Sequence, residues 1–287
     1  MKILVFGSNG QLGKSLKKNH KNNIYKILFK SKKQIDITDY NALLRSVIKN
    51  NPKIIINCAA FTNVDLCEIQ KRISRKINSS ATKNLLSICK KFNIFLIHLS
   101  TDYVFNSNKL KKFSEDDHTN PVNYYGFTKL LGEQKIISSN IPSIIIRTSF
   151  LYSNYSKNFY TKILKALPKN KKLFVVNDII SSPTNANDLS KAIFHIINYN
   201  MYSKVSKPTL FHFANSGYCS RYQFVKFIIK NIDHNISLKP IKSSAYSKSQ
   251  TATRPKFSIL DNRKFQNFFK YKIKNWKSSL KSELKCN

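Results

Sequence analysis

Met1-Lys2-Ile3-Leu4-Val5-Phe6-Gly7-Ser8-Asn9-Gly10-Gln11-Leu12-Gly13 is the opening stretch of the chain, and it carries the clearest indication of the fold. Its apolar run at residues 3–6 is typical of a buried strand and leads straight into three of the chain's six glycines, Gly7, Gly10 and Gly13. A G-x-x-G-x-x-G turn lets the backbone approach a pyrophosphate closely, and the N-terminus of the following helix directs amide donors at it. The stretch therefore predicts a dinucleotide-binding strand, turn and helix.

Strand-like and helix-like segments alternate through the rest of the first half of the chain. Apolar runs and segments with helical periodicity occur, in chain order, at residues 24–29, 43–48, 54–57, 85–89, 94–99 and 144–147. This order is typical of a parallel sheet whose strands are covered by helices on both faces. We predict a doubly wound α/β fold of the Rossmann type, with ligands bound beyond the carboxyl ends of the strands.

The pattern becomes less regular after about residue 148. Further helices and strands are expected near residues 159–167, 173–176, 210–213 and 222–229. We predict a dinucleotide-binding domain at residues 1–147 and a smaller, mainly substrate-binding domain at residues 148–287. Elements from about 183–216 are expected to return to the first domain.

The chain is strongly basic, with 50 Lys and Arg against 14 Asp and Glu among 287 residues, which gives a formal net charge of +36. Such a charge is typical of proteins that bind nucleic acids, because cations displace counterions from phosphates. The lysines are spread along the whole chain, however, and do not gather in one segment. We therefore expect no specific nucleic-acid partner, although a positive field would speed the encounter with anionic ligands.

Several features favour a cytoplasmic protein without a membrane partner. No apolar run approaches the roughly 20 residues that a membrane-spanning helix needs. The N-terminal apolar stretch ends at Gly7, without the cleavage site of a signal peptide. The five cysteines are odd in number and form no C-x-x-C pair, so we expect unpaired thiols.

The end of the second predicted strand indicates which cofactor is bound. Dinucleotides without a 2′-phosphate are usually recognised by an acidic residue about 20 residues after the glycines. Here the sequence reads Phe29-Lys30-Ser31-Lys32-Lys33, which contains cations and no carboxylate. We expect Lys30 and Ser31 to contact the cofactor and NADPH to be preferred, with NADH as the alternative.

A tyrosine and a lysine four residues apart, Tyr125 and Lys129, are the candidate catalytic pair. On a helix this spacing brings both side chains to one face. A nearby ammonium stabilises a phenolate, so Lys129 would make Tyr125 a better acid-base catalyst near neutral pH. Thr101 ends a predicted strand at the edge where such sheets bind ligands, and its hydroxyl would orient a substrate carbonyl.

Taken together, these segments resemble the extended short-chain dehydrogenases, and within them the dTDP-4-dehydrorhamnose reductase family. The resemblance covers most of the chain, and the motifs follow one another in the family's order. The matching segments are residues 7–13, 57–65, 100–105, 115–121, 125–133, 147–152, 158–159, 182–184 and 254–261.

The resemblance implies hydride transfer from NADPH to the C4 keto group of a dTDP-4-keto-6-deoxy sugar, which converts dTDP-4-dehydro-L-rhamnose to dTDP-L-rhamnose. It also implies that Thr101, Tyr125 and Lys129 are the catalytic residues and that the product enters cell-surface polysaccharide synthesis. Contacts with the cofactor are expected at Gly7, Asn9, Gly10, Gln11, Leu12, Gly13, Lys30, Ser31, Asp36, Ile37, Ala59, Ala60, Thr62, Tyr125 and Lys129. Contacts with the substrate are expected at Thr101, Asp102, Val104, Phe105, Phe150, Asn158 and Arg254, with a structural salt bridge as the alternative role of Arg254.

The chain departs from the family pattern at several positions. Phe150 and Ile179 stand where the rhamnose-forming enzymes usually have Trp and often have Gln, so another keto sugar or nucleotide carrier stays open. Ser15 stands where some members carry a glutamate that helps to bind magnesium between subunits. We therefore expect no obligatory metal, and the sequence leaves a homodimer open.

Two other functions use the same features. The family resemblance extends to nucleotide-sugar epimerases, which keep their cofactor through turnover, and to the regulatory subunit of methionine adenosyltransferase, which binds a dinucleotide without catalysis. Related dehydratases carry an acid after the Thr-Asp pair, where this chain has Tyr103. The intact Thr101, Tyr125 and Lys129 favour the reductase over the non-catalytic subunit.

Overall fold

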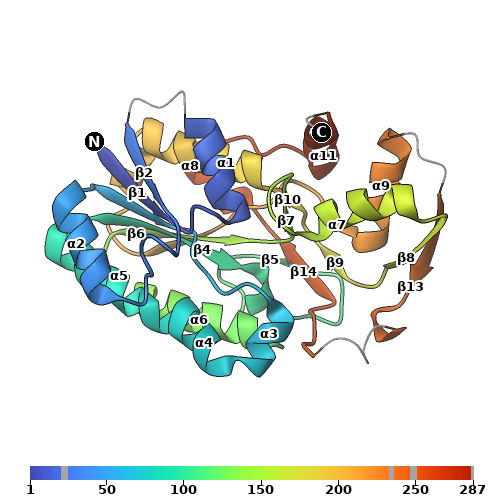
Figure 1. Ribbon diagram of the computed structural model, residues 1–287, viewed down its shortest axis with the longest axis horizontal. Coiled ribbons are helices and arrows are strands. Elements are labelled where there is room, and N and C mark those ends of the chain that lie inside the picture. The colour runs from blue at the N-terminus through green and yellow to red at the C-terminus, as the bar shows by residue number, and fades with distance from the viewer. Residues whose placement is uncertain (21–24, 233–235, 246–250, 286–287) are drawn as a thin grey trace.

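Six parallel strands form the central sheet of the protein, in the order β11-β6-β4-β3-β1-β2 (Figure 1). The computed structural model describes residues 1–20, 25–232, 236–245 and 251–285. The strands are β1 (Lys2–Phe6), β2 (Lys26–Lys30), β3 (Ile54–Asn57), β4 (Phe95–Thr101), β6 (Ser143–Thr148) and β11 (Thr209–His212). β2 lies on one side of β1, whereas β3, β4 and β6 follow on its other side, so the sheet is doubly wound as predicted.

Helices cover both faces of the sheet (Figure 1). Ile3 and Val5 of β1 point into one apolar cluster, and Leu4 and Phe6 point into another, because successive strand side chains face opposite ways. The first cluster takes in α1 (Gln11–Asn19), α8 (Ala186–Asn198) and α10 (Arg263–Phe269), and the second takes in α2 (Tyr40–Asn50), α5 (Ala81–Phe92) and α6 (Tyr124–Ile137). These four side chains of β1 are fully buried, which explains why residues 3–6 form a continuous apolar run.

Between β3 and α5 the chain makes three short turns of helix on the face that α6 covers. These are α3 (Val64–Ile69), α4 (Lys71–Arg75) and a π-helical turn (Lys76–Ser80). The π-helical turn packs against α6 closely enough that a Cβ at Gly132 would lie 2.5 Å from the carbonyl oxygen of Asn78.

A second body of structure lies beyond the carboxyl ends of the sheet strands, at the right of Figure 1. Its own apolar cluster includes Tyr152, Tyr160, Phe224 and Trp276. Its helices and longer strands are α7 (Phe159–Ala166), β8 (Lys172–Val176), α9 (Arg221–Asn231), β13 (Ser237–Ile241) and α11 (Trp276–Leu284). The remaining strands are β5 (Lys112–Phe113), β7 (Leu151–Tyr152), β9 (Ile180–Ser181), β10 (Thr184–Asn185), β12 (Cys219–Ser220) and β14 (Phe257–Leu260), and 3₁₀ turns occur at Asp102–Val104, Leu167–Lys169 and Met201–Lys204.

The α/β fold with a parallel central sheet is confirmed. The strand expected near residues 210–213 is β11, which pairs with β6 and so returns to the main sheet. Ile24, the first residue of the second predicted strand, lies outside the described residues. The domain boundary between residues 147 and 148 stays a prediction.

Two further observations concern the described residues only. Cys58, Cys67, Cys89 and Cys219 are unpaired thiols, and Cys286 lies outside the described part of the chain. Within that part, no helix combines the length and the apolar character needed to cross a membrane.

Candidate active site

A cleft of about 250 Å³ lies at the carboxyl ends of β1, β2 and β3, and we call it the glycine-loop cleft. This is the sheet edge where the strand order reverses and where doubly wound sheets bind their ligands. The residues lining it are Gly7, Asn9, Gly10, Lys32, Lys33, Ile35, Asp36, Ile37, Cys58, Ala59, Ala60 and Ile77. It therefore brings together seven of the residues predicted to contact a dinucleotide: Gly7, Asn9, Gly10, Asp36, Ile37, Ala59 and Ala60.

The floor of the glycine-loop cleft depends on a backbone that only glycine adopts readily. Gly7 has a φ of +77°, and a Cβ there would lie 2.6 Å from the backbone nitrogen of Ala59. The turn closes with a hydrogen bond of 3.0 Å from the Gly10 amide to the Gly7 carbonyl. No side chain caps the N-terminus of α1, so its first amides are available to an anionic group.

The side chains at the end of β2 are arranged differently from the sequence prediction. Lys32 and Lys33 line the cleft, whereas the predicted Lys30 and Ser31 do not. The Ser31 amide and hydroxyl both donate to Gln34 Oε1, at 2.9 and 3.1 Å, which forms a turn directly after the strand. The two lysines are thus the cations best placed for a ribose 2′-phosphate.

Asp36 is also part of the glycine-loop cleft. Burial acts to raise the pKa of its carboxyl, but hydrogen bonds from Thr38 and the charges of Lys32 and Lys76 outweigh it and hold the pKa below its usual value. The ionised carboxylate accepts the Thr38 amide at 2.9 Å. An ionised Asp36 can accept a hydrogen bond from an exocyclic amine such as that of adenine.

Other predicted cofactor residues are engaged within the protein or lie away from the cleft. The Gln11 side chain donates to the Leu151 carbonyl at 3.4 Å and accepts from the Ser153 hydroxyl at 3.2 Å. Leu12 is buried in the core under α1, and Thr62 is exposed. Gly13 belongs to α1, where a Cβ would lie 2.4 Å from the Gly7 carbonyl oxygen, so it fixes the turn from within the helix.

The position of α6 sets the position of the candidate catalytic residues. A Cβ at Gly126 would lie 2.1 Å from the carbonyl oxygen of Tyr103, so only glycine lets α6 approach the turn that follows β4 this closely. Asn123 caps the helix by accepting the Gly126 amide at 2.8 Å. Farther along, Glu133 and Arg147 form a buried ion pair at 2.7 Å that ties α6 to β6.

Tyr125 lies in the first turn of α6, close to the end of β4. The Thr101 hydroxyl is near enough to the phenol to influence its pKa, and the rings of Tyr103 and Tyr125 meet edge to face with centroids 5.8 Å apart. Burial raises the pKa of Tyr125 above its ordinary value, and the nearby Thr101 hydroxyl opposes this. The phenol is therefore fully protonated at neutral pH, which is the state that a proton donor requires.

Lys129 lies one helical turn farther along α6 and is almost completely buried. Its ammonium donates to the Leu99 carbonyl at 2.7 Å and lies 3.3 Å from Nε2 of His98. Burial lowers the pKa of Lys129 to about 8, although Glu133 and Cys58 act in the opposite direction. Lys129 is thus cationic at neutral pH but loses its charge not far above it.

His98 and Asn57 lie beneath Lys129, and the sequence analysis missed both. Asn57 Oδ1 accepts the Ala59 amide at 3.1 Å, so its NH₂ group faces His98 Nδ1 at 3.1 Å and donates to it. Burial, with the charge of Lys129, lowers the pKa of His98 well below its usual value and keeps the ring neutral. His98 and Ser100 are two residues apart in β4, so their side chains lie on the same face of the sheet. This spacing of polar residues in an apolar strand is the signal in the sequence that could have pointed to His98.

Four of the predicted substrate residues are engaged within the protein. Val104 and Phe105 are fully buried in an apolar cluster with Phe113 and Leu260, so their side chains support the site from behind. Asn158 is the N-cap of α7, and its amide is engaged with the backbone of residues 153–161. Asp102 accepts hydroxyls from Ser149 at 2.7 Å and Ser258 at 2.5 Å, and burial raises the pKa of its carboxyl.

Arg254 and Phe150 are the remaining two predicted substrate residues. Arg254 forms a two-pronged ion pair with Asp65, at 2.6 and 3.1 Å, and its hydrogen bond holds the pKa of Asp65 below the usual range. Phe150 packs on Phe224 and Phe159, with centroids 4.8 and 5.7 Å apart. The guanidinium of Arg221, another residue that the sequence analysis missed, lies over the Phe150 ring.

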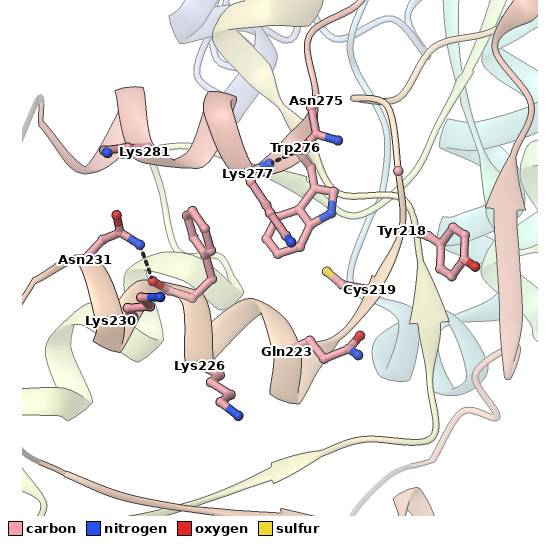
Figure 2. A pocket seen from close by; sticks show the side chains of 12 residues that line it. Tyr218, Cys219, Gln223, Lys226, Lys230, Asn231, Asn275, Trp276, Lys277 and Lys281 are labelled. Carbon is pink, nitrogen blue, oxygen red and sulfur yellow. Dashed lines mark hydrogen bonds between the residues drawn. The ribbon is translucent and has the colours of Figure 1, made fainter.

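A second and larger hollow, of about 680 Å³, lies between α9 and α11 (Figure 2). Trp276, Phe227 and Cys219 form its apolar wall. Four lysines surround it: Lys226, Lys230, Lys277 and Lys281. It includes none of the predicted site residues, so we assign the chemistry to the glycine-loop cleft and the adjoining Tyr125.

Comparison with known proteins supports this assignment. The family model of the RmlD substrate binding domain matches residues 1–286. The chain is 32% identical to a dTDP-4-dehydrorhamnose reductase of Sinorhizobium fredii over 97% of this chain and 95% of that protein, and 31% identical to the spore coat polysaccharide biosynthesis protein SpsK of Bacillus subtilis over 99% and 96%. The crystal structure of dTDP-4-dehydrorhamnose reductase from Bacillus anthracis in complex with NADP superimposes with a TM-score of 0.93 at 29% identity, over 100% of this chain and 99% of that one.

Proposed function

We propose, on the premise that the chain belongs to the RmlD substrate binding domain family, that it is an NADPH-dependent reductase of a nucleotide-linked keto sugar. The reaction is hydride transfer to the C4 keto group of dTDP-4-dehydro-L-rhamnose, which yields dTDP-L-rhamnose for cell-surface polysaccharide synthesis. Relatives of about the same length that bear the name dTDP-4-dehydrorhamnose reductase support this substrate.

One observation carries the proposal. The Thr101 hydroxyl and the Tyr125 phenol lie near each other at the carboxyl edge of the sheet, and Lys129 lies one helical turn farther along the helix that carries the phenol. Hydroxyl, phenol and ammonium side chains in this order provide a carbonyl-orienting group, a proton donor and a cation.

Thr101, Tyr125 and Lys129 each have a separate role in the proposed reduction. The Thr101 hydroxyl, which donates to Asp102 Oδ1 in this structure, would turn to donate to the substrate carbonyl oxygen and so place the carbon for attack. Tyr125, which burial keeps protonated, gives its proton to that oxygen as negative charge develops on it. The ammonium of Lys129 then stabilises the phenolate that remains.

The glycine-loop cleft fits a phosphorylated dinucleotide. Its floor is a backbone cradle that a Cβ at Gly7 would fill, and its rim carries Lys32 and Lys33. NADPH supplies the hydride when it is bound. Asn9, Gly10, Ala59 and Ala60 would hold its pyrophosphate and adenosine by backbone contacts, and the two lysines would hold the 2′-phosphate.

We further propose that the protein works in the cytoplasm, without a nucleic-acid partner or an obligatory metal. Unpaired thiols at Cys58, Cys67, Cys89 and Cys219 are typical of a reducing compartment. The cations are distributed along the chain and not concentrated on one segment, which favours a general positive field that attracts nucleotides. Activity that disappears in a metal chelator and returns with magnesium would contradict the metal-free proposal.

The deciding experiment follows NADPH absorbance after purified protein is mixed with freshly prepared dTDP-4-dehydro-L-rhamnose, with the product identified by NMR. The wild type is expected to consume one NADPH for each dTDP-L-rhamnose formed. Tyr125→Phe keeps the ring but lacks the proton donor, so its kcat should fall by about 10²- to 10⁴-fold while its Kd for NADPH stays unchanged.

Other outcomes point to other functions. Interconversion of sugar epimers without net NADPH consumption would indicate an epimerase. Tight NADPH binding without turnover of any keto sugar would indicate a non-catalytic dinucleotide-binding subunit.

A further inference from the structure

Arg221 is the first residue of α9, and its charge is not neutralised within the described part of the protein. Its Nη1 atom is shielded from solvent and has no hydrogen-bond partner. The ion pairs among the described residues join Lys111 to Asp117, Arg147 to Glu133, Arg254 to Asp65 and Arg263 to Asp261, and none involves Arg221. A buried donor atom of a guanidinium that has no partner is costly, so its retention calls for a functional explanation.

The nearest carboxylate does not act as its partner. Asp102 is close enough for its charge to influence Arg221, yet both of its oxygens accept hydroxyls instead, one from Thr101 and the other from Ser149 and Ser258. Arg254, the other cation nearby, is held by Asp65. The unsatisfied donor of Arg221 therefore stands next to a second positive charge, in a place that favours an anion.

Aromatic rings hold the guanidinium in one orientation. Its central carbon lies 3.1 Å from the centroid of the Phe150 ring and 5.4 Å from that of Phe159. Phe150 itself has a φ of +39°, a left-handed conformation that is unfavourable for a bulky residue and is typical of functional sites. The backbone is thus strained to present the ring on which Arg221 lies.

Arg221 is also close to the surroundings of the catalytic phenol. The Tyr103 ring contacts the Tyr125 ring, and the positive charge of Arg221 acts on the Tyr103 phenol. A nucleotide sugar whose keto carbon reaches Tyr125 needs to extend only past Tyr103 to bring its phosphates to Arg221.

We infer that Arg221, fixed on Phe150, binds the diphosphate of the nucleotide-sugar substrate. This inference rests on the proposed function, because it takes the substrate to be a nucleoside diphosphate sugar. A planar guanidinium donates two parallel hydrogen bonds to phosphate oxygens, and a shielded location strengthens them. A carboxylate on the sugar would have the same chemistry, so the test uses nucleotides that carry no sugar.

The test measures the Kd of dTDP and of thymidine for the NADPH complexes of the wild type, Arg221→Met, Arg221→Lys and Lys226→Met. Calorimetry serves for dTDP and ligand-observed NMR for the weaker nucleoside. Lys226→Met is the matched control, because it removes one exposed positive charge from the same helix α9. The Tm and the Kd of NADPH verify that each variant is folded.

Arg221→Met should weaken dTDP binding about 10- to 100-fold and leave thymidine within about twofold, since only the diphosphate meets the guanidinium. Arg221→Lys should recover part of the loss, and Lys226→Met should change dTDP binding less than about twofold. Equal weakening of both ligands by Arg221→Met, or weakening of neither, would overturn the inference and indicate a purely structural stacking role.

The two proposals fail in different ways. If the wild type reduces no keto sugar but Arg221→Met loses the preference for dTDP over thymidine, the diphosphate site is upheld and the reductase is rejected. If Arg221→Met reduces the keto sugar with the KM of the wild type, the reductase is upheld and the diphosphate site is rejected. A wild-type protein that binds none of dTDP, UDP and GDP would reject both.

Discussion

Gly7 and Phe150 occupy similar places in the molecule and share a left-handed backbone conformation, but one has no side chain and the other has a bulky one. Each follows the carboxyl end of a parallel strand, Gly7 after β1 and Phe150 after β6, and each has a positive φ, +77° and +39°. At Gly7 a side chain is excluded, because a Cβ would lie 2.6 Å from the Ala59 nitrogen. At Phe150 the side chain is retained despite the strain, because its ring packs on Phe224 and carries Arg221.

The difference bears on what each side of the proposed site would recognise. The glycine-loop cleft is lined mainly by residues 7–60, with a backbone floor at Gly7, and this suits a cofactor whose phosphates are bound by amides. The side around Phe150 is built from side chains that come from the segment after β6 and from α7 and α9. Side chains can be exchanged without altering the sheet, so in the proposed function this is the side on which sugar and nucleotide specificity would change.

The largest effect is expected from Gly7→Ala. The alanine must adopt a left-handed conformation and its Cβ meets backbone that cannot move aside, so the free energy of unfolding should fall by about 3 kcal/mol. Urea denaturation measures the loss, and fluorescence titration should show weaker NADPH binding. Gly10→Ala is the control, because its nearest contact would be the Gly7 carbonyl oxygen at 3.3 Å, and a similar loss in both variants would refute the role of the Gly7 conformation.

The next effect concerns β4, which lies between β6 and β3 in the sheet and holds Lys129 through the Leu99 carbonyl. The pKa of Lys129 is lowered to about 8 in the folded protein by burial, against about 10.4 in the unfolded chain. Between these values the unfolded chain binds more protons, so the stability of the cofactor-free wild type relative to Lys129→Met should rise by about 2 to 3 kcal/mol as the pH rises through this window.

Urea unfolding of the wild type and Lys129→Met at a series of pH values measures this difference. Lys90→Met, which removes an exposed lysine of α5, should show no comparable change relative to the wild type. A flat difference between wild type and Lys129→Met would mean that the buried ammonium keeps its ordinary proton affinity.

The smallest effect isolates the strain at Phe150. Phe150→Ala and Phe150→Gly lose the same aromatic contacts, but glycine relieves the left-handed strain, so the glycine variant should be more stable than the alanine variant by about 1 kcal/mol. At Lys162, an exposed position inside α7, the order should reverse, because glycine is less stable than alanine in a helix by about 1 kcal/mol. The same order at both positions would show that Phe150 is not strained.

Much of the sheet could be predicted from the sequence, whereas most of the small strands could not. β1, β3 and β4 are buried on both faces, so they appear as apolar runs between segments of helical periodicity. Strands such as β7 and β9 are two residues long, too short to show any alternation, and are defined by partners far along the chain. Their existence depends on tertiary contacts that a local pattern does not contain.

The candidate site divides along similar lines. Tyr125 and Lys129 share one helix, so their spacing alone places them together. Arg221 could not be recognised, because one more cation among 50 carries no signal until the fold sets it against Phe150. Lys32 and Lys33 line the cleft, whereas Lys30 and Ser31 were the predicted contacts, because the turn that Ser31 makes with Gln34 depends on side-chain hydrogen bonds that the sequence pattern does not show.

Because β11 pairs with β6, the central sheet cannot be completed until late in the synthesis of the chain. Sixty residues lie between Thr148 and Thr209, and all of them must emerge from the ribosome before β6 can pair with β11. Until then the Ser143–Thr148 edge presents unpaired amides and carbonyls next to a finished glycine-loop cleft. Bound NADPH would therefore stabilise the early half of the protein during synthesis, while the side of the proposed site around Phe150 is completed last.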